Sequence, residues 1–143
     1  MIGLRRGDVR LFEHNKEWEI EGERTVNELC EILGSDAIDI QHVGSTSIKN
    51  IKAKPIIDIA VGTDDFKRVL AHEDELLKVG YHYRPNHDMD GTQRLFACGS
   101  YYEGGDMQTH FIHVVKYNSM EWRNYINFRD YLNTYPDIAK QYE

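Results

Sequence analysis

Two neighbouring segments of the chain carry the residue types that phosphate chemistry requires. The first, His42–Ser47, contains a Gly-Ser pair, and the second, Lys54–Asp58, ends in an acid. A Gly-Ser pair that closes a strand lets the backbone approach an anion, and serine and threonine hydroxyls add hydrogen-bond donors. If a short helix begins near Ser47, its N-terminus also favours a phosphate there. The candidate phosphate ligands are Gly44, Ser45 and Thr46.

Asp58 lies in an apolar stretch, Lys54–Val61, that is typical of a central strand. An acid in such a strand needs a partner, and either a divalent cation or a lysine would serve. The twelve residues between Ser45 and Asp58 are enough for a loop that returns the chain to an adjacent strand. Alternatively, Gly44-Ser45 is only a turn and Asp58 pairs with Lys54 or an arginine. Spacing alone leaves both interpretations open.

Histidine, basic and aromatic residues add further candidates. His42 is either a catalytic residue or a satisfied histidine at a strand end. Three basic residues could neutralise phosphate, or could form ordinary surface ion pairs. They are Lys54, Arg94 and Arg129. Tyr101 and Tyr102, in a glycine-rich loop, either stack on a base or pack locally.

The elements that must position these residues fit in one domain. The chain has 143 residues, 41% of them hydrophobic and 29% charged, without a repeat or a linker, so a single domain over residues 1–143 is expected. No apolar run is long enough to span a membrane. Cys30 and Cys98 form no CxxC motif, which favours a reducing cytoplasm. The net charge of −7 disfavours a broad nucleic-acid-binding surface.

Hydrophobic periodicity and turn residues predict alternating helices and strands. Helices are expected at 16–33, 64–79, 120–133 and from Pro136, and strands at 37–43, 54–61, 81–84, 92–98 and 108–117. This order predicts an α/β (α+β) domain with a mixed, partly antiparallel sheet flanked by helices. The strand order within the sheet does not follow from the pattern.

Local signals locate several of the boundaries. Asn15, Thr63 and Ser119 are the expected N-caps of the first three helices. Asp90-Gly91 indicates a hairpin turn between two of the strands. Cys30 falls on the apolar stripe of the first helix and is expected to be a small core residue.

The motifs of this chain resemble those of the GrpB family. The hallmark of that family is a His-Val-Gly-Ser-Thr stretch followed by Ala-Lys-Pro-Ile-Ile-Asp, and both stand here at residues 42–46 and 53–58. Further matches are Trp18, the stretch Thr109–Val115 and the stretch Phe128–Leu132. The resemblance extends from about Leu11 to Tyr142, and family members usually continue for another helix.

GrpB proteins are similar to nucleotidyltransferases related to polymerase beta, which implies a nucleotidyltransferase-like mixed sheet flanked by helices. In that superfamily a Gly-Ser turn holds nucleotide phosphates, and an Asp-x-Asp strand holds two metal ions. The resemblance therefore implies that Gly44 and Ser45 bind phosphate and that Asp58 is the second acid. Ile56 stands at the position of the first acid. If Asp58 is instead taken as the first acid of the pair, the second position is Ala60, which is not acidic either.

The superfamily supplies a third acid on a later strand, where this chain has His113. Relatives often carry His-x-His there, whereas this chain has Phe111 at the first position. His110, one residue earlier, is expected on the opposite strand face. The resemblance thus implies that Asp58 and His113 hold a divalent metal, Mg²⁺ or Mn²⁺, and act in catalysis with His42.

Two functions of different class follow. One is a metal-dependent nucleotidyltransferase that acts on an unknown acceptor. The alternative is a non-catalytic nucleotide- or phosphate-binding or accessory domain, which the missing acid at position 56 favours. The expected partner is a nucleotide or another phosphate-bearing small molecule. Neither a membrane nor nucleic acid is expected, and the sequence does not indicate the oligomeric state.

Overall fold

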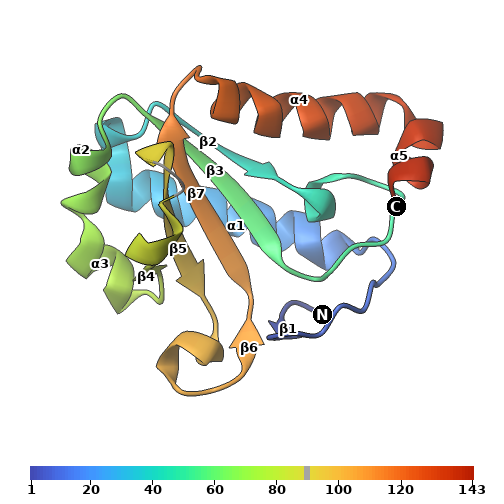
Figure 1. The fold of residues 1–143 in the computed structure, drawn as a ribbon, viewed down its shortest axis with the longest axis horizontal. Coiled ribbons are helices and arrows are strands. Elements are labelled where there is room, and N and C mark those ends of the chain that lie inside the picture. Colours follow the sequence, from blue (N-terminus) through green and yellow to red (C-terminus); the bar gives the residue numbers. More distant parts are fainter. Residues whose placement is uncertain (89–90) are drawn as a thin grey trace.

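A computed structural model describes residues 1–88 and 91–143 as a sheet between unequal layers of helices (Figure 1). The helices are α1 (Lys16–Leu33), α2 (Phe66–Leu70), α3 (Glu73–Lys78), α4 (Met120–Thr134) and α5 (Pro136–Tyr142). The strands are β1 (Leu4–Arg5), β2 (Asp39–Val43), β3 (Ile57–Thr63), β4 (His82–Tyr83), β5 (Gln93–Cys98), β6 (Met107–Gln108) and β7 (His110–Lys116). Among these described elements, no helix has the length and apolar character needed to cross a membrane.

The main sheet has the strand order β2-β3-β7-β5-β4. β3 and β7 pair in parallel, and the other neighbours in this sheet pair antiparallel. Strands β1 and β6 form a separate two-stranded ribbon. The predicted mixed sheet flanked by helices is therefore confirmed, and the apolar strand that carries Asp58 lies inside the sheet between β2 and β7.

Alternate residues of the central strands face two different layers, because successive strand side chains point to opposite sides. One face, which carries Ile57, Ile59 and Val61, packs in the main core with α1, α2 and α3. The other face carries Ala60, which packs with Trp122 of α4 in a smaller cluster. In Figure 1, α1 passes behind the strands, whereas α4 lies along the top of the view. The second face is thus only partly covered.

The ends of α1 and α4 follow the predicted capping. The Asn15 side chain accepts a hydrogen bond from the Glu17 N–H at 2.7 Å, and Ser119 accepts one from the Trp122 N–H at 3.2 Å. The prediction for Cys30 is wrong, since this residue is exposed while its neighbour Leu29 is buried. One residue along a helix is a turn of 100°, which takes Cys30 off the core-facing side.

The predicted helix 64–79 is instead two short helices, α2 and α3, separated at residues 71–72. Its N-cap is Asp65 rather than Thr63, whose hydroxyl donates to the Asp36 carbonyl oxygen at 2.8 Å. Strand β3 starts at Ile57, later than expected. β4 and β5 pair antiparallel as a hairpin requires, but position 90 of the predicted turn lies outside the described residues.

Helix α1 packs tightly against β2 at Gly22. A Cβ atom at this buried glycine would lie 2.4 Å from Nδ1 of His42, whose ring is hydrogen bonded through Nε2 to Thr46 at 2.9 Å. A carbon that close overlaps a ring that is already held at its far end. The absence of a side chain at position 22 therefore sets the spacing between α1 and the sheet.

We predict that Gly22→Ala destabilises the domain by about 1–3 kcal/mol, although alanine is the better helix former. In a His42→Ala background the same change is expected to be neutral or stabilising, because the colliding ring is gone. Urea unfolding of the four proteins of this double-mutant cycle measures the coupling. Equal effects of Gly22→Ala in both backgrounds would contradict the packing described here.

Candidate functional site

The partly covered face of the sheet contains three adjoining cavities. The largest, about 580 Å³, and a second of about 480 Å³ are both lined by Ser45, Asp58 and Tyr142. A third, of about 280 Å³, is lined by His113 and shares Phe111 with the largest. We call the three together the cleft. Asp58 and His113 thus lie where the cavities meet.

Asp58 and His113 form the central contact of the cleft. They project from the neighbouring parallel strands β3 and β7, and His113 Nε2 lies 2.9 Å from Asp58 Oδ1. Both side chains are partly buried, with 28% and 17% of their surface exposed. The acid in the apolar strand thus has a partner, as expected, but the partner is a histidine of a different strand rather than Lys54 or an arginine. Within the described residues the other ring nitrogen, Nδ1, is buried and has no hydrogen-bond partner.

The Gly44-Ser45 turn lies directly over the carboxylate. Gly44 has φ of +73°, and a Cβ there would lie 2.7 Å from Asp58 Oδ2. Only glycine combines this backbone conformation with so close an approach. A short 3-10 turn follows at Ser45–Ser47. The turn and the acid are therefore adjacent, which is the first of the two arrangements that the spacing of the motifs left open.

Tyr125 of α4 closes the cleft beside His113. The two rings are 5.1 Å apart between centroids and inclined by 31°. Burial, followed by the nearby Asp58 charge, raises the pKa of Tyr125 to about 12. Its hydroxyl therefore stays protonated at neutral pH, and it donates a hydrogen bond to Gln93 Oε1 at 3.4 Å. Tyr125 holds the His113 ring from the side of the helix.

Lys54 lies on the rim of the largest cavity together with Ile56. Lys54 is exposed and, within residues 1–88 and 91–143, forms no ion pair. Its ammonium is therefore available to an anion in the cleft. Ile56, in the place of the missing first acid, lines the same cavity as Asp58 and adds no charge to it.

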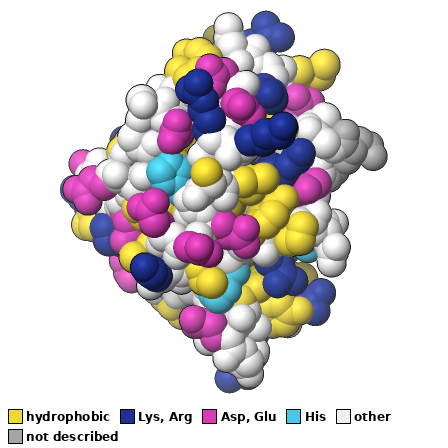
Figure 2. All heavy atoms as spheres, turned by 90° about the vertical axis from the view of Figure 1, so that its left-hand side faces the viewer, with side chains coloured by type: hydrophobic (Ala, Val, Ile, Leu, Met, Phe, Trp, Pro, Cys, Tyr) yellow, Lys and Arg dark blue, Asp and Glu magenta, His cyan; other side chains and the backbone are white. Residues whose placement is uncertain are grey.

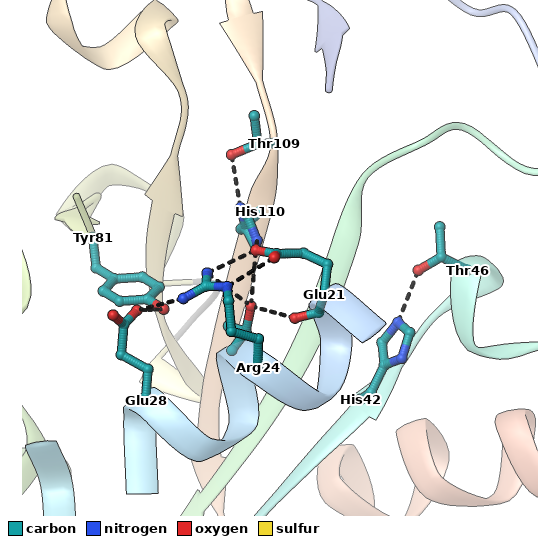
Figure 3. Close-up of polar contacts among 9 residues, drawn as sticks. Glu21, Arg24, Glu28, His42, Thr46, Tyr81, Thr109 and His110 are labelled. Carbon is teal, nitrogen blue, oxygen red and sulfur yellow. Dashed lines mark hydrogen bonds and ion pairs between the residues drawn. The ribbon is translucent and has the colours of Figure 1, made fainter. Parts of the chain in front are cut away.

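His42 and Thr46, both predicted at the site, lie on the other side of the sheet (Figure 3). The register pairs Val43 with Asp58 and His42 with Ile59, so His42 shares the face that packs on α1. Burial lowers the pKa of His42 to about 4, and Thr46 is 1% exposed. Their mutual hydrogen bond satisfies both side chains inside the core. His42 is therefore a hydrogen-bonded histidine near the end of its strand, which is the second of the two roles that the sequence allowed.

Arg94 and Arg129 do not reach the cleft either. Arg94 lies on the α2 side, over the Phe66 ring and 3.6 Å from the Asp88 carboxylate. Arg129 donates from Nη1 to the Gln41 side chain and to the His42 carbonyl oxygen, at 2.9 and 3.0 Å. Each guanidinium is held by local partners, so these arginines fix elements of the fold and leave Lys54 as the predicted base nearest the site.

His110 belongs to a polar network on the covered face, as its position next to Phe111 predicted (Figure 3). Its Nε2 lies 2.7 Å from Glu21 Oε2, and its Nδ1 lies 2.7 Å from the Thr109 hydroxyl. Arg24 binds both oxygens of Glu21, and Tyr81 donates to Glu28 in the same network. Burial lowers the pKa of His110, which favours the neutral ring. This network joins α1 to the sheet and is separate from the cleft.

The donor atoms of the cleft fit one divalent cation and not two. A carboxylate and an imidazole nitrogen converge at Asp58 and His113. The carboxylate suits Mg²⁺ or Mn²⁺, whereas the imidazole is a poor ligand for Mg²⁺, so the pair favours Mn²⁺. Across the described part of the chain, no three His, Cys, Asp or Glu side chains gather into a metal-binding group. A second tightly held cation would lack a bridging acid.

The GrpB protein family model matches residues 8–143 of this chain. The chain belongs to the GrpB family. It is 40% identical, over 144 aligned residues, to the Glutamate-rich protein GrpB of Alkalihalophilus pseudofirmus, covering the whole chain and 82% of that relative. The crystal structure of the conserved protein GrpB from Enterococcus faecalis is similar with a TM-score of 0.81 and 29% identity, over 91% of this chain and 76% of that one.

The GrpB fold is also similar to that of a nucleotidyltransferase. The structure of Cid1 in complex with its short product ApU matches with a TM-score of 0.58 over 89% of this chain and 38% of that chain. The sequence identity is 17%, so the likeness concerns the fold alone. The nucleotidyltransferase-like fold that the motifs implied is thereby confirmed.

Sequence reasoning missed two kinds of residue in this GrpB cleft. Tyr125 and Phe128 look like core positions because they follow Trp122 at helical spacing, yet they line the second cavity. Arg6 and Arg84 line the third cavity although they lie in elements with no recognisable motif. Only the tertiary arrangement brings these residues to the cleft.

We predict that acidification destabilises this protein through His42. The folded-state pKa is about 4 against an ordinary value of 6.5, so the unfolded chain binds more protons between these pH values and stability falls as pH drops through them. The loss amounts to roughly 3 kcal/mol on completion. His42→Gln, which keeps a nitrogen for Thr46, is expected to flatten the pH dependence of urea unfolding from pH 6.5 to 4. His87→Gln, at an exposed histidine, is the control. An unchanged slope in His42→Gln would contradict this.

Proposed function

We propose that this GrpB protein binds a nucleoside triphosphate in the cleft together with one divalent cation and transfers its nucleotidyl group to a hydroxyl-bearing acceptor. The observation that carries this proposal is the contact between Asp58 and His113, 2.9 Å apart, beneath the Gly44-Ser45 turn. Solved Cid1 structures hold MgGTP and the UTP analogue UMPNPP, which is the chemistry this fold supports elsewhere.

The phosphate chain is bound at the Gly44-Ser45 turn. With φ of +73°, Gly44 lets the backbone approach phosphate oxygens, and the Ser45 hydroxyl and N–H add donors. Lys54, exposed on the rim of the same cavity, neutralises part of the negative charge. The aromatic side chains of the second cavity, Tyr125 and Phe128, offer the base an apolar surface.

Asp58 and His113 would hold the cation, with its remaining ligand positions left to the nucleotide's phosphates. When bound, such a cation offsets the charge that develops on the phosphate oxygens. His113 keeps its orientation through Tyr125, whose ring lies 5.1 Å away. Gly44 keeps the Asp58 carboxylate directly below the phosphate chain.

Transfer then exchanges one phosphorus–oxygen bond for another. The acceptor hydroxyl oxygen attacks the α-phosphorus with a lone pair, and its proton leaves to solvent. The bond from the α-phosphorus to the bridging oxygen breaks, and pyrophosphate departs with that electron pair. The nucleoside monophosphate ends on the acceptor as a phosphodiester.

A nucleotide-binding or accessory domain without turnover is the second candidate. Ile56 favours it, because this residue lines the cavity at the position where the resemblance places the first acid. Release of pyrophosphate from ATP, GTP, CTP or UTP with Mn²⁺ separates the two candidates. Nucleotide binding without pyrophosphate release in the presence of diverse hydroxyl acceptors would favour the domain without turnover.

We predict that Asp58→Asn abolishes Mn²⁺-dependent nucleotide binding, since among the described residues no third His, Cys, Asp or Glu gathers with Asp58 and His113 to replace it. Thermal unfolding with each of the four nucleotides, with and without Mn²⁺, measures the effect. A nucleotide at a hundred times its Kd adds about 2.7 kcal/mol to wild-type stability. Asp74→Asn, at an exposed acid of α3, is the matched control. Equal stabilisation of wild type and Asp58→Asn would refute the site.

We also predict that Ser45→Glu removes nucleotide binding while the domain stays folded, because a carboxylate then occupies the phosphate position. Ser35→Glu, at an exposed serine, introduces the same charge elsewhere. Calorimetric titration with the nucleotide that binds wild type measures both variants, and urea unfolding checks their folding. Unimpaired binding to Ser45→Glu would place the nucleotide elsewhere.

A further inference from the structure

The third cavity of the cleft, of about 280 Å³, is basic and aromatic, and we call it the arginine pocket. Its polar and aromatic lining includes Arg6, Arg84, His87, Tyr101, Tyr102 and Gln108. None of the described residues that line it is Asp or Glu, although the chain has 24 acids and a net charge of −7. Figure 2 shows the usual pattern on the face that carries α2 and α3, where acidic and basic side chains are interspersed. The absence of carboxylates from the described lining therefore distinguishes this pocket from the rest of an acidic protein.

The two arginines keep their charge free for a ligand. Neither Arg6 nor Arg84 forms an ion pair within the described residues. Other arginines nearby do: Arg5 Nε lies 3.3 Å from Asp106, and Arg94 Nε lies 3.6 Å from Asp88. Guanidinium groups without a carboxylate partner bind phosphate or carboxylate through paired N–H donors.

Aromatic rings hold both guanidinium groups in place. Arg6 lies over the Tyr101 ring at 4.9 Å, and Arg84 lies over the Tyr102 ring at 4.9 Å. The Tyr102 hydroxyl accepts a hydrogen bond from Gln108 Nε2 at 3.0 Å, which fixes the ring. Such cation–π contacts leave the N–H edges of a guanidinium open to a ligand. Tyr101 and Tyr102 therefore pack locally, as one of the two sequence interpretations had it, and their packing partners are the two arginines.

The pocket lies on the opposite side of the Asp58–His113 contact from the Gly44-Ser45 turn. Across the sheet the order is β2, which ends at Val43 before the turn, then β3, β7, β5 and β4. Arg84 follows β4, and its N–H donates to the Leu95 carbonyl oxygen of β5. In phosphoryl transfer the attacking and leaving oxygens lie roughly in line on opposite sides of the phosphorus. With the leaving phosphates over the turn, the attacking hydroxyl enters from the arginine pocket.

We infer that the arginine pocket is the acceptor subsite and that the acceptor is a small hydroxyl compound carrying an anionic group, a phosphate or a carboxylate, bound by Arg6 and Arg84. This inference rests on the proposed function for the direction of attack. The anion-binding property rests on the pocket alone, so the two can be tested apart.

Calorimetric titration with three matched probes tests the inference: glycerol 3-phosphate, glycerate and uncharged glycerol, each at millimolar concentration. We expect one of the two anions to bind with a stoichiometry of one and glycerol not to bind. The double variant Arg6→Gln/Arg84→Gln is expected to weaken anion binding about tenfold or more. Arg68→Gln, at an exposed arginine of α2, should bind as wild type, and Arg6→Lys/Arg84→Lys should recover part of the affinity. The favoured anion identifies the acceptor's acidic group.

Two further arms separate this inference from the proposed nucleotide site. Asp58→Asn should leave anion binding intact, and Arg6→Gln/Arg84→Gln should leave the Mn²⁺-dependent stabilisation by nucleotide intact. Anion binding that is lost in Ser45→Glu but not in the arginine variant would overturn the inference, as would no binding of either anion. Tighter, arginine-dependent binding of a short oligoribonucleotide than of both small anions would assign the pocket to a nucleic-acid end and equally overturn it.

Discussion

The contact between Asp58 and His113 is the constraint on which the cleft depends. An acid inside an apolar strand needs a partner, and β7 supplies one because it runs parallel beside β3 on the same face. The Gly44 turn can lie over that acid only because position 44 has no side chain. Tyr125 then supports His113 from α4. Strand pairing, turn and helix thus converge on one carboxylate.

The two faces of the sheet are covered by helices to different extents, and their histidines have different surroundings. Helices α1, α2 and α3 cover one face, and there His110 is buried, His42 is partly buried, and both are hydrogen bonded. Helix α4 covers only part of the other face, which leaves His113 beside open volume. The same residue type therefore stabilises one layer and lines a cleft in the other. The neutral form that burial favours for His42 and His110 suits the first role.

The sequence predicts the helices and strands of this fold well wherever the signal is local. Asn15 and Ser119 cap their helices as expected, and the apolar run around Asp58 is an inner strand. The motifs around Gly44 and Asp58 also locate the centre of the cleft. The wrong site predictions depend on strand register. The face that His42 occupies is decided by whether His42 or Val43 stands opposite Asp58, and no residue in the pattern specifies that pairing. The prediction that Arg94 binds phosphate is wrong for the same reason. Arg6 and Arg84 lie in no motif that could have indicated their place in the cleft.

The parallel pairing of β3 with β7 also determines when the cleft comes into being during folding. Asp58 and His113 are 55 residues apart in the chain, and α2, α3, β4 and β5 all lie between them. Closing so long a loop is entropically costly, and non-local pairings of this kind form slowly. The hairpin of β2 with β3 has a much shorter loop, so its closure costs less entropy. The Gly-Ser turn and its acid are therefore joined through a short loop, whereas the histidine reaches them only when β7 pairs with β3.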